Sequence, residues 1–196
     1  MRVAAALCFV FLGAAGAQAQ GAQSAYTRTG GADCRTTPVM QDKIEIGATT
    51  VCKGFAGIAV TQFEDDSRVA VSYGRKPSGE PAASTFFGPL NSIGDMIEWR
   101  YVKSGDKSLP HATILRWRLS PVDEHDHVKK LDVLVVTRLA PGPVCHVAYV
   151  DAEANPNANE LARQAADRMA KSFRCEADKP AMAGLPGRAA KILIGP

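Results

Sequence analysis

The feature that most constrains this fold is a series of short runs rich in apolar and β-branched residues. Polar turn signals separate the runs, a pattern that is typical of β-strands. The runs lie at 43–52, 58–63, 68–73, 96–102, 112–119, 131–138 and 144–150. The polar connections at 64–67 and 103–107 are short, which favours antiparallel pairing of neighbouring strands. We therefore predict one antiparallel sheet of about seven strands, either a meander or a strongly curved, barrel-like sheet.

The alternation of side chains predicts which face of two strands is buried. Because side chains of a strand point alternately to opposite faces, Trp99 and Trp117 face the core while Arg100, Arg116 and Arg118 lie together on the other face. Guanidinium groups gathered in this way bind carboxylates, phosphates or the acidic surface of another protein. The alternative is a solvated sheet face with partial cross-strand pairing. We take these three arginines as the candidate ligand-binding residues.

A helix is predicted from about Pro156 to Phe173. Apolar residues recur there at spacings of three and four, namely Ala158, Leu161, Ala162, Ala165, Met169 and Phe173. Asn155 before Pro156 is a typical helix start, with the asparagine side chain as the expected cap. Arg163 with Asp167, and Asp167 with Lys171, form opposite-charge pairs four residues apart on the polar side.

The run Val133–Val136 does not alternate, so we expect a central strand that is covered on both faces. The C-terminal helix is the natural cover for its second face. The predicted fold class is therefore α+β, a curved antiparallel sheet packed against one C-terminal helix.

The first nineteen residues have the pattern of a cleavable secretory signal peptide. Arg2 precedes the apolar run Val3–Leu12, and Ala17–Ala19 offers small residues for cleavage after Ala19. The run is too short to span a membrane. Cys8 raises the alternative of a lipoprotein, but it lies inside the apolar run. We expect a protein located in the periplasm or secreted, with no membrane association after cleavage.

The rest of the chain has the length of one domain. Residues 20–33 carry almost no large apolar side chains and are expected to be a flexible N-terminal arm. A single α+β domain is predicted for 34–180, and a flexible tail rich in Ala, Pro and Gly for 181–196. The net charge of +3 is too small to indicate a nucleic-acid partner.

After removal of the signal peptide, the four remaining cysteines are expected to form two disulfides. An even number in an exported chain favours disulfides over metal ligands, and no Cys-x-x-Cys pair supports zinc. Three pairings are possible. We favour Cys34–Cys52 and Cys145–Cys175, because each closes a local loop.

Several stretches together resemble a family of small exported proteins from rhizobial and related alphaproteobacteria. They are Val51–Phe55, Ile97–Arg100, Pro110–Trp117, Val133–Thr137, Cys145–Asp151, Asn155–Asn159, Phe173–Cys175 and Asp178–Pro180. The family is uncharacterised. The resemblance implies a periplasmic or secreted location and transfers neither an activity nor a site residue.

The densest group of metal-capable side chains is Glu124–His127. If this segment is extended, His125 and His127 share a face and are candidate metal ligands, whereas the alternative is a solvated polar loop. The sequence contains no Gly-x-Ser-x-Gly, His-Glu-x-x-His or Walker motif, so we assign no catalytic residue and no cofactor. The expected function is a non-enzymatic binding or interaction module for an unknown periplasmic protein or a small anionic ligand. A metal-binding protein and a hydrolase are the alternatives.

Overall fold

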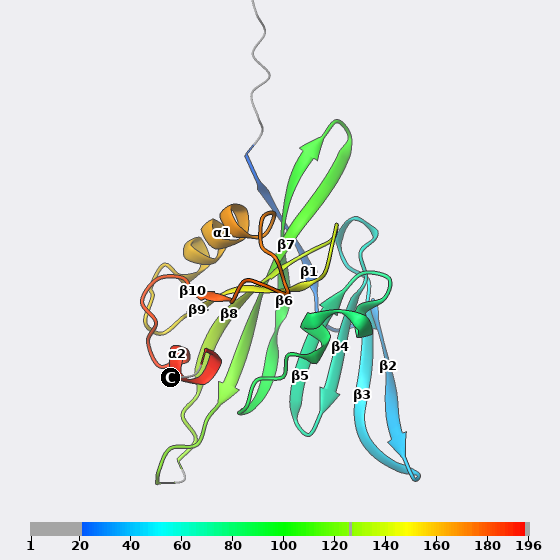
Figure 1. The fold of residues 1–196 in the computed structure, drawn as a ribbon. Helices are drawn as coiled ribbons and strands as arrows, with labels where there is room; N and C mark the ends of the chain where they lie inside the picture. The colour runs from blue at the N-terminus through cyan, green and yellow to red at the C-terminus, as the bar shows by residue number, and fades with distance from the viewer. Residues whose placement is uncertain (1–20, 126, 195–196) are drawn as a thin grey trace, which may run out of the picture.

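A computed structural model describes residues 21–125 and 127–194, so the predicted signal peptide at 1–19 lies outside the described residues. Within them the α+β class is confirmed, but the strands form two sheets and neither closes into a barrel (Figure 1). The expectation of one sheet is wrong because the strands predicted at 43–52, 58–63 and 68–73 pair with one another and with an additional strand. Each of the seven predicted runs overlaps one strand, although β4 (Val60–Asp65), β6 (Leu90–Ser104) and β7 (Lys107–Ser120) extend beyond the predicted bounds.

The larger sheet has six strands in the order β1-β6-β7-β8-β9-β10. Their bounds are β1 Gln23–Arg28, β6 Leu90–Ser104, β7 Lys107–Ser120, β8 Leu131–Arg138, β9 Cys145–Asp151 and β10 Ala181–Met182. From β6 to β9 the strands form an antiparallel meander, as predicted. The β6–β7 hairpin extends beyond the rest of the sheet (Figure 1).

The smaller sheet has four antiparallel strands in sequence order. They are β2 Cys34–Gln41, β3 Ile44–Cys52, β4 Val60–Asp65 and β5 Arg68–Tyr73. Short 3-10 turns occur at η1 Phe55–Gly57, η2 Pro77–Gly79 and η3 Pro81–Ser84. The segment that carries η2 and η3 connects β5 to β6, and therefore joins one sheet to the other.

Both predicted flexible ends contain regular structure. β1 lies within the expected arm at 20–33 and pairs antiparallel with β6. Thr27 accepts a hydrogen bond at 2.8 Å from the indole N–H of Trp99. The expected tail contains β10, which pairs parallel with β9, and helix α2, Ala189–Leu193. β1 and β10 are held at the sheet edges largely by backbone pairing, whereas Ala189, Ile192 and Leu193 of α2 pack against the main core.

The main core lies between the two sheets. Trp99 and Trp117 are completely buried there, as the alternation predicts. Val60, Val71 and Tyr73 from the smaller sheet belong to the same cluster. Burying large apolar side chains is the main favourable contribution to folding, so this cluster joins the two sheets into one unit.

A second cluster lies between the larger sheet and helix α1, Ala158–Met169. Alanines on the helix and the more C-terminal Phe173 pack against Ile114, Leu134 and Val136. The strand at Val133–Val136 is therefore buried on both faces, as predicted. Asn155 does not act as the expected side-chain cap, because its amide oxygen accepts the N–H of Leu185 at 2.9 Å. Asn155 instead fastens the C-terminal segment to the helix start.

The disulfides are Cys34–Cys52 and Cys145–Cys175, so the predicted pairing is confirmed. Cys34 and Cys52 are register partners on β2 and β3, while the second bridge links the start of β9 to the segment after α1. Loop-closure entropy gives each bridge a stabilisation of about 3–4 kcal/mol.

Non-reducing digestion of the purified protein followed by mass spectrometry should recover a peptide that joins Cys145 to Cys175. Alkylation before digestion should label none of the four cysteines, because each is bonded in the folded chain. A peptide joining Cys52 to Cys145 would contradict this pairing.

Candidate functional site

The three arginines singled out from the sequence lie on one face of the larger sheet, but helix α1 covers part of that face. Arg100 on β6 pairs with Ala112 of β7, and Arg116 and Arg118 follow Ala112 at alternate positions. Arg100 is only 7% exposed, since it lies beneath the helix. The prediction that Arg100 belongs to an exposed basic face is therefore wrong.

Ion pairs between the sheet and α1 occupy Arg100. Its Nε donates to Asp167 Oδ1 at 3.0 Å, and Arg163 Nε donates to Glu98 Oε1 at 2.6 Å. Arg163 and Asp167 of the helix therefore pair with residues of the sheet. They do not pair with each other, although their four-residue spacing predicted such a pair. A charge under a packed helix requires a partner, because an unpaired buried charge is costly. Arg100 consequently joins two structural elements and is unavailable to an external ligand.

The other two arginines also have partners within the sheet. Arg116 Nη1 donates to Asp132 Oδ2 at 3.0 Å, and Arg118 donates to the carbonyl oxygen of Ile93 at 3.1 Å. Asp132 lies opposite Arg118 on β8 and lowers the positive charge of this face. The alternation of residues identifies the face correctly, but it contains no information on the helix and the aspartate that neutralise it.

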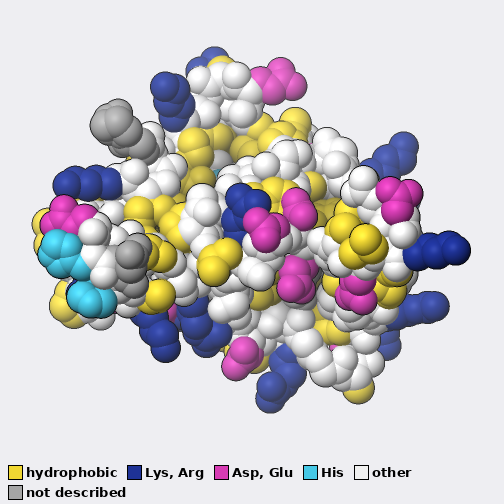
Figure 2. All heavy atoms as spheres, turned by 90° about the horizontal axis from the view of Figure 1, so that it is seen from below, with side chains coloured by type: hydrophobic (Ala, Val, Ile, Leu, Met, Phe, Trp, Pro, Cys, Tyr) yellow, Lys and Arg dark blue, Asp and Glu magenta, His cyan; other side chains and the backbone are white. Residues whose placement is uncertain are grey.

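His125 and His127 lie on an exposed loop between β7 and β8. Both residues are exposed, and Figure 2 shows histidine side chains at one edge of the molecule. Asp123 accepts the backbone N–H groups of both residues at 2.9 Å, which stabilises a local turn. No group of three or more potential metal-binding side chains occurs in the described part of the chain. The loop geometry therefore favours the alternative that these histidines belong to a solvated loop.

A large cavity lies where one end of the smaller sheet meets the β8–β9 loop. It has a volume of about 970 Å³, within the range of small-molecule sites. Much of its wall is apolar, with Val51, Ile58, Leu139 and Val144 among the lining residues. A ligand with an apolar body can therefore displace water from this wall.

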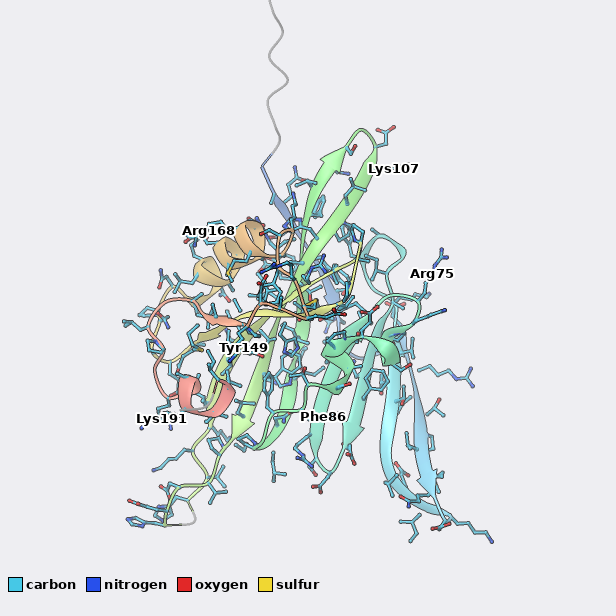
Figure 3. All side chains as sticks on the ribbon, in the orientation of Figure 1. Arg75, Phe86, Lys107, Tyr149, Arg168 and Lys191 are labelled. Atoms are coloured by element: carbon cyan, nitrogen blue, oxygen red, sulfur yellow. A yellow bond between two sulfur atoms is a disulfide. The ribbon has the colours of Figure 1, made fainter. Side chains whose placement is uncertain are left out.

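Two cationic side chains, Arg75 and Lys76, line this cavity. Both are exposed, and neither forms an ion pair with another residue of the described chain. Figure 3 shows Arg75 directed outward on the side of the smaller sheet. Glu80 also lines the cavity, but its carboxylate accepts the N–H of Val144 at 2.7 Å. The unpaired positive charge of Arg75 and Lys76 is available to an anionic group.

The buried Tyr73 contributes to the same wall. Burial raises the pKa of its hydroxyl group, so the phenol remains neutral at physiological pH. The cavity thus combines apolar side chains, a neutral phenol and two cations. Arg75 and Lys76 follow the buried strand β5 after one residue, Gly74, and this adjacent pair of cations is the signal that the sequence analysis did not use.

Comparison with protein-family models, curated protein sequences and solved structures finds no match to this chain. None of the helices in the described residues is both long enough and apolar enough to cross a membrane. Two disulfides fit a protein that folds in an oxidising compartment.

Proposed function

We propose that this chain is an exported, non-enzymatic binding protein that takes an anionic ligand with an apolar body into the 970 Å³ cavity. The observation that carries the proposal is that apolar side chains and two cationic side chains, Arg75 and Lys76, line the same cavity. Neither cation has an ion-pair partner in the described chain. A periplasmic or secreted location is part of the proposal. It is supported by the signal-like N-terminus, the two disulfides and the resemblance to exported alphaproteobacterial proteins.

The cavity favours an anionic amphiphile over other ligand classes for two physical reasons. The apolar wall stabilises a hydrocarbon or aromatic body by removing its surface from water. Arg75 and Lys76 then attract the charged group, and Arg75 can hold a carboxylate or phosphate through two parallel hydrogen bonds. The fixed acidic group of Glu80 lies among the lining residues and disfavours a second negative charge nearby.

Dodecanoate is a suitable probe because it combines one carboxylate with an apolar chain. Isothermal titration calorimetry should show saturable binding to the wild-type protein. Reversal of both charges, Arg75→Glu with Lys76→Glu, should weaken binding by about tenfold or more, since each exposed charge contact contributes up to about 1 kcal/mol. Circular dichroism and a urea titration should show that the variant retains its fold and stability.

A matched control reverses two exposed lysines far from the cavity, Lys107→Glu with Lys191→Glu. Lys107 lies near the tip of the β6–β7 hairpin and Lys191 on α2 (Figure 3). This variant changes the net charge by the same amount and should bind dodecanoate as the wild type does. Equal weakening in both variants would indicate a long-range charge effect, and absence of saturable binding to the wild type would exclude the proposed site.

A further inference from the structure

The β8–β9 loop forms one wall of the 970 Å³ cavity, which we call the ligand cavity. Leu139, Ala140 and Val144 of this loop line the cavity. The loop also contains Pro141 and Pro143, which have no amide hydrogen and so cannot donate backbone hydrogen bonds. The position of the loop therefore depends strongly on the side chains and the covalent bond that hold it.

Arg138 holds this loop against the end of α1. The residue is buried, and its guanidinium donates to the carbonyl oxygens of Pro141 at 2.8 Å and Pro143 at 2.7 Å. Its Nε donates to the carbonyl oxygen of Ala170, the residue that follows α1, at 3.0 Å. A cation is favourable here, because the carbonyl groups at the C-terminal end of a helix carry partial negative charge. One side chain thus fixes the loop to the helix.

The disulfide Cys145–Cys175 holds the same loop at its C-terminal end. Cys145 is buried and is the first residue after the loop. Cys175 is half-buried, and its Sγ lies 3.3 Å from the carbonyl oxygen of Pro143 and 3.9 Å from Nη1 of Arg138. The bridge is therefore in direct contact with both the loop and the guanidinium that holds it.

We propose that the Cys145–Cys175 bridge is a redox switch for the ligand cavity. A dithiol reductant opens the bridge, and the opened form binds the anionic amphiphile more weakly. This inference rests on the proposed function, because it concerns the same cavity. Neither cysteine lines the cavity, so the bridge acts on the ligand only through the β8–β9 loop.

Opening of the bridge is a two-electron thiol–disulfide exchange. One thiolate of the reductant attacks Sγ of Cys175, which is the less buried cysteine. The S–S bond breaks, its electron pair goes to Sγ of Cys145, and this sulfur takes up a proton. The second thiol of the reductant loses its proton and attacks the mixed disulfide. Cys175 then leaves as a thiolate, and the reductant becomes a cyclic disulfide.

A thiolate at Cys175 changes the forces on the loop. Arg138 stabilises it, because a nearby cation favours the thiolate form of a cysteine. The negative sulfur competes with the carbonyl oxygen of Pro143 for Nη1 of Arg138, and it repels this oxygen at the short distance between them. Loss of the covalent bond also frees the loop from the segment after α1. The cavity wall is then less preorganised for a ligand.

Two matched double variants test the switch. Cys145→Ser with Cys175→Ser removes this bridge, and Cys34→Ser with Cys52→Ser removes the other, whose strands remain paired by backbone hydrogen bonds. Each variant loses a comparable stabilisation from loop closure. In calorimetry the first variant should bind dodecanoate about fivefold or more weakly than the wild type, in the range typical of coupling between two sites. The second should bind it as the wild type does.

Hydrogen exchange tests the loop without a ligand. The N–H of Val144 donates to Glu80 Oε2 at 2.7 Å, so it should exchange slowly while the loop is held in place. It should exchange about fivefold or more rapidly in the first variant than in the second, because the same coupling is then measured on the loop itself. Equal exchange in the two variants would show that the bridge does not control the loop and would overturn the switch.

The wild-type protein allows a measurement that does not depend on the folding of a variant. In buffers of reduced and oxidised dithiothreitol, alkylation followed by mass spectrometry gives the closed fraction of each bridge. Because linkage between two equilibria is reciprocal, saturating dodecanoate should favour closed Cys145–Cys175 by the same factor by which opening weakens binding. The closed fraction of Cys34–Cys52 should stay unchanged.

The outcomes separate the switch from the proposed function. Equal dodecanoate affinity in the wild type and in both variants would overturn the switch and leave the proposed function intact. An equal effect of dodecanoate on both bridges would also overturn the switch, since it would indicate general stabilisation of the fold. Absence of dodecanoate binding to the wild type would overturn both.

Discussion

Replacement of Arg100 by alanine is expected to lower the free energy of unfolding by about 3 kcal/mol. The change leaves Asp167 of α1 without the guanidinium that donates to it at 3.0 Å, and removes a positive charge close to Glu98. Removal of one partner from a buried ion pair typically costs 3–5 kcal/mol. We take the lower end because the Asp167 side chain is 31% exposed. Urea unfolding followed by circular dichroism measures the loss.

Arg118→Ala is the matched control, since it removes the same side chain from the exposed end of the same sheet face. Surface changes of this kind are usually within about 0.5 kcal/mol. Adding Asp167→Asn to Arg100→Ala should restore part of the lost stability, because the uncompensated charge is then removed. Similar losses for Arg100→Ala and Arg118→Ala would show that the ion pairs under α1 do not hold the helix to the sheet.

Acidification should destabilise the fold through His146, which is buried between the two sheets. Burial lowers the pKa of His146 from 6.5 to about 4, and its ring stacks against Phe87. The unfolded chain binds a proton at this residue below about pH 6.5, while the folded chain does so only near pH 4. The contribution of His146 to the free energy of unfolding is therefore fully present above pH 6.5 and is lost as the pH falls toward 4. The expected loss from this one residue is about 3 kcal/mol.

Urea unfolding of the wild type at several pH values between 7 and 4 measures this loss. The variant His146→Phe isolates the contribution of His146, because His111 and Asp167 also destabilise the fold on acidification. Its stability should fall with pH less steeply than that of the wild type. His125→Ala removes an exposed histidine and should retain the wild-type dependence. Identical pH dependence in the wild type and in His146→Phe would contradict the assignment of the proton uptake to His146.

The local pattern of residues was sufficient to locate most strands, the inward position of Trp99 and Trp117, and helix α1. These features depend on the period of the side chains along one element, so a single chain contains the required information. The pairing Cys34–Cys52 was also accessible, because it closes a local loop of the chain. β1, β2 and β10 were missed, since an edge strand held by backbone hydrogen bonds needs no hydrophobic pattern.

The proposed ligand site and the switch beside it depend on contacts that only the tertiary structure creates. Strand alternation placed Arg100 on the correct face, but Asp167, which pairs with it, comes from a helix distant in the sequence. The ligand cavity likewise combines the end of β3 with the segment after β5 and the β8–β9 loop, and His111 meets Asp167 only because a bulge turns it toward α1. The sequence by itself thus determined which side chains share a face, because that follows from backbone geometry. Which element covers the face, and which charges remain free, was decided by packing between distant segments, for which local periodicity carries no signal.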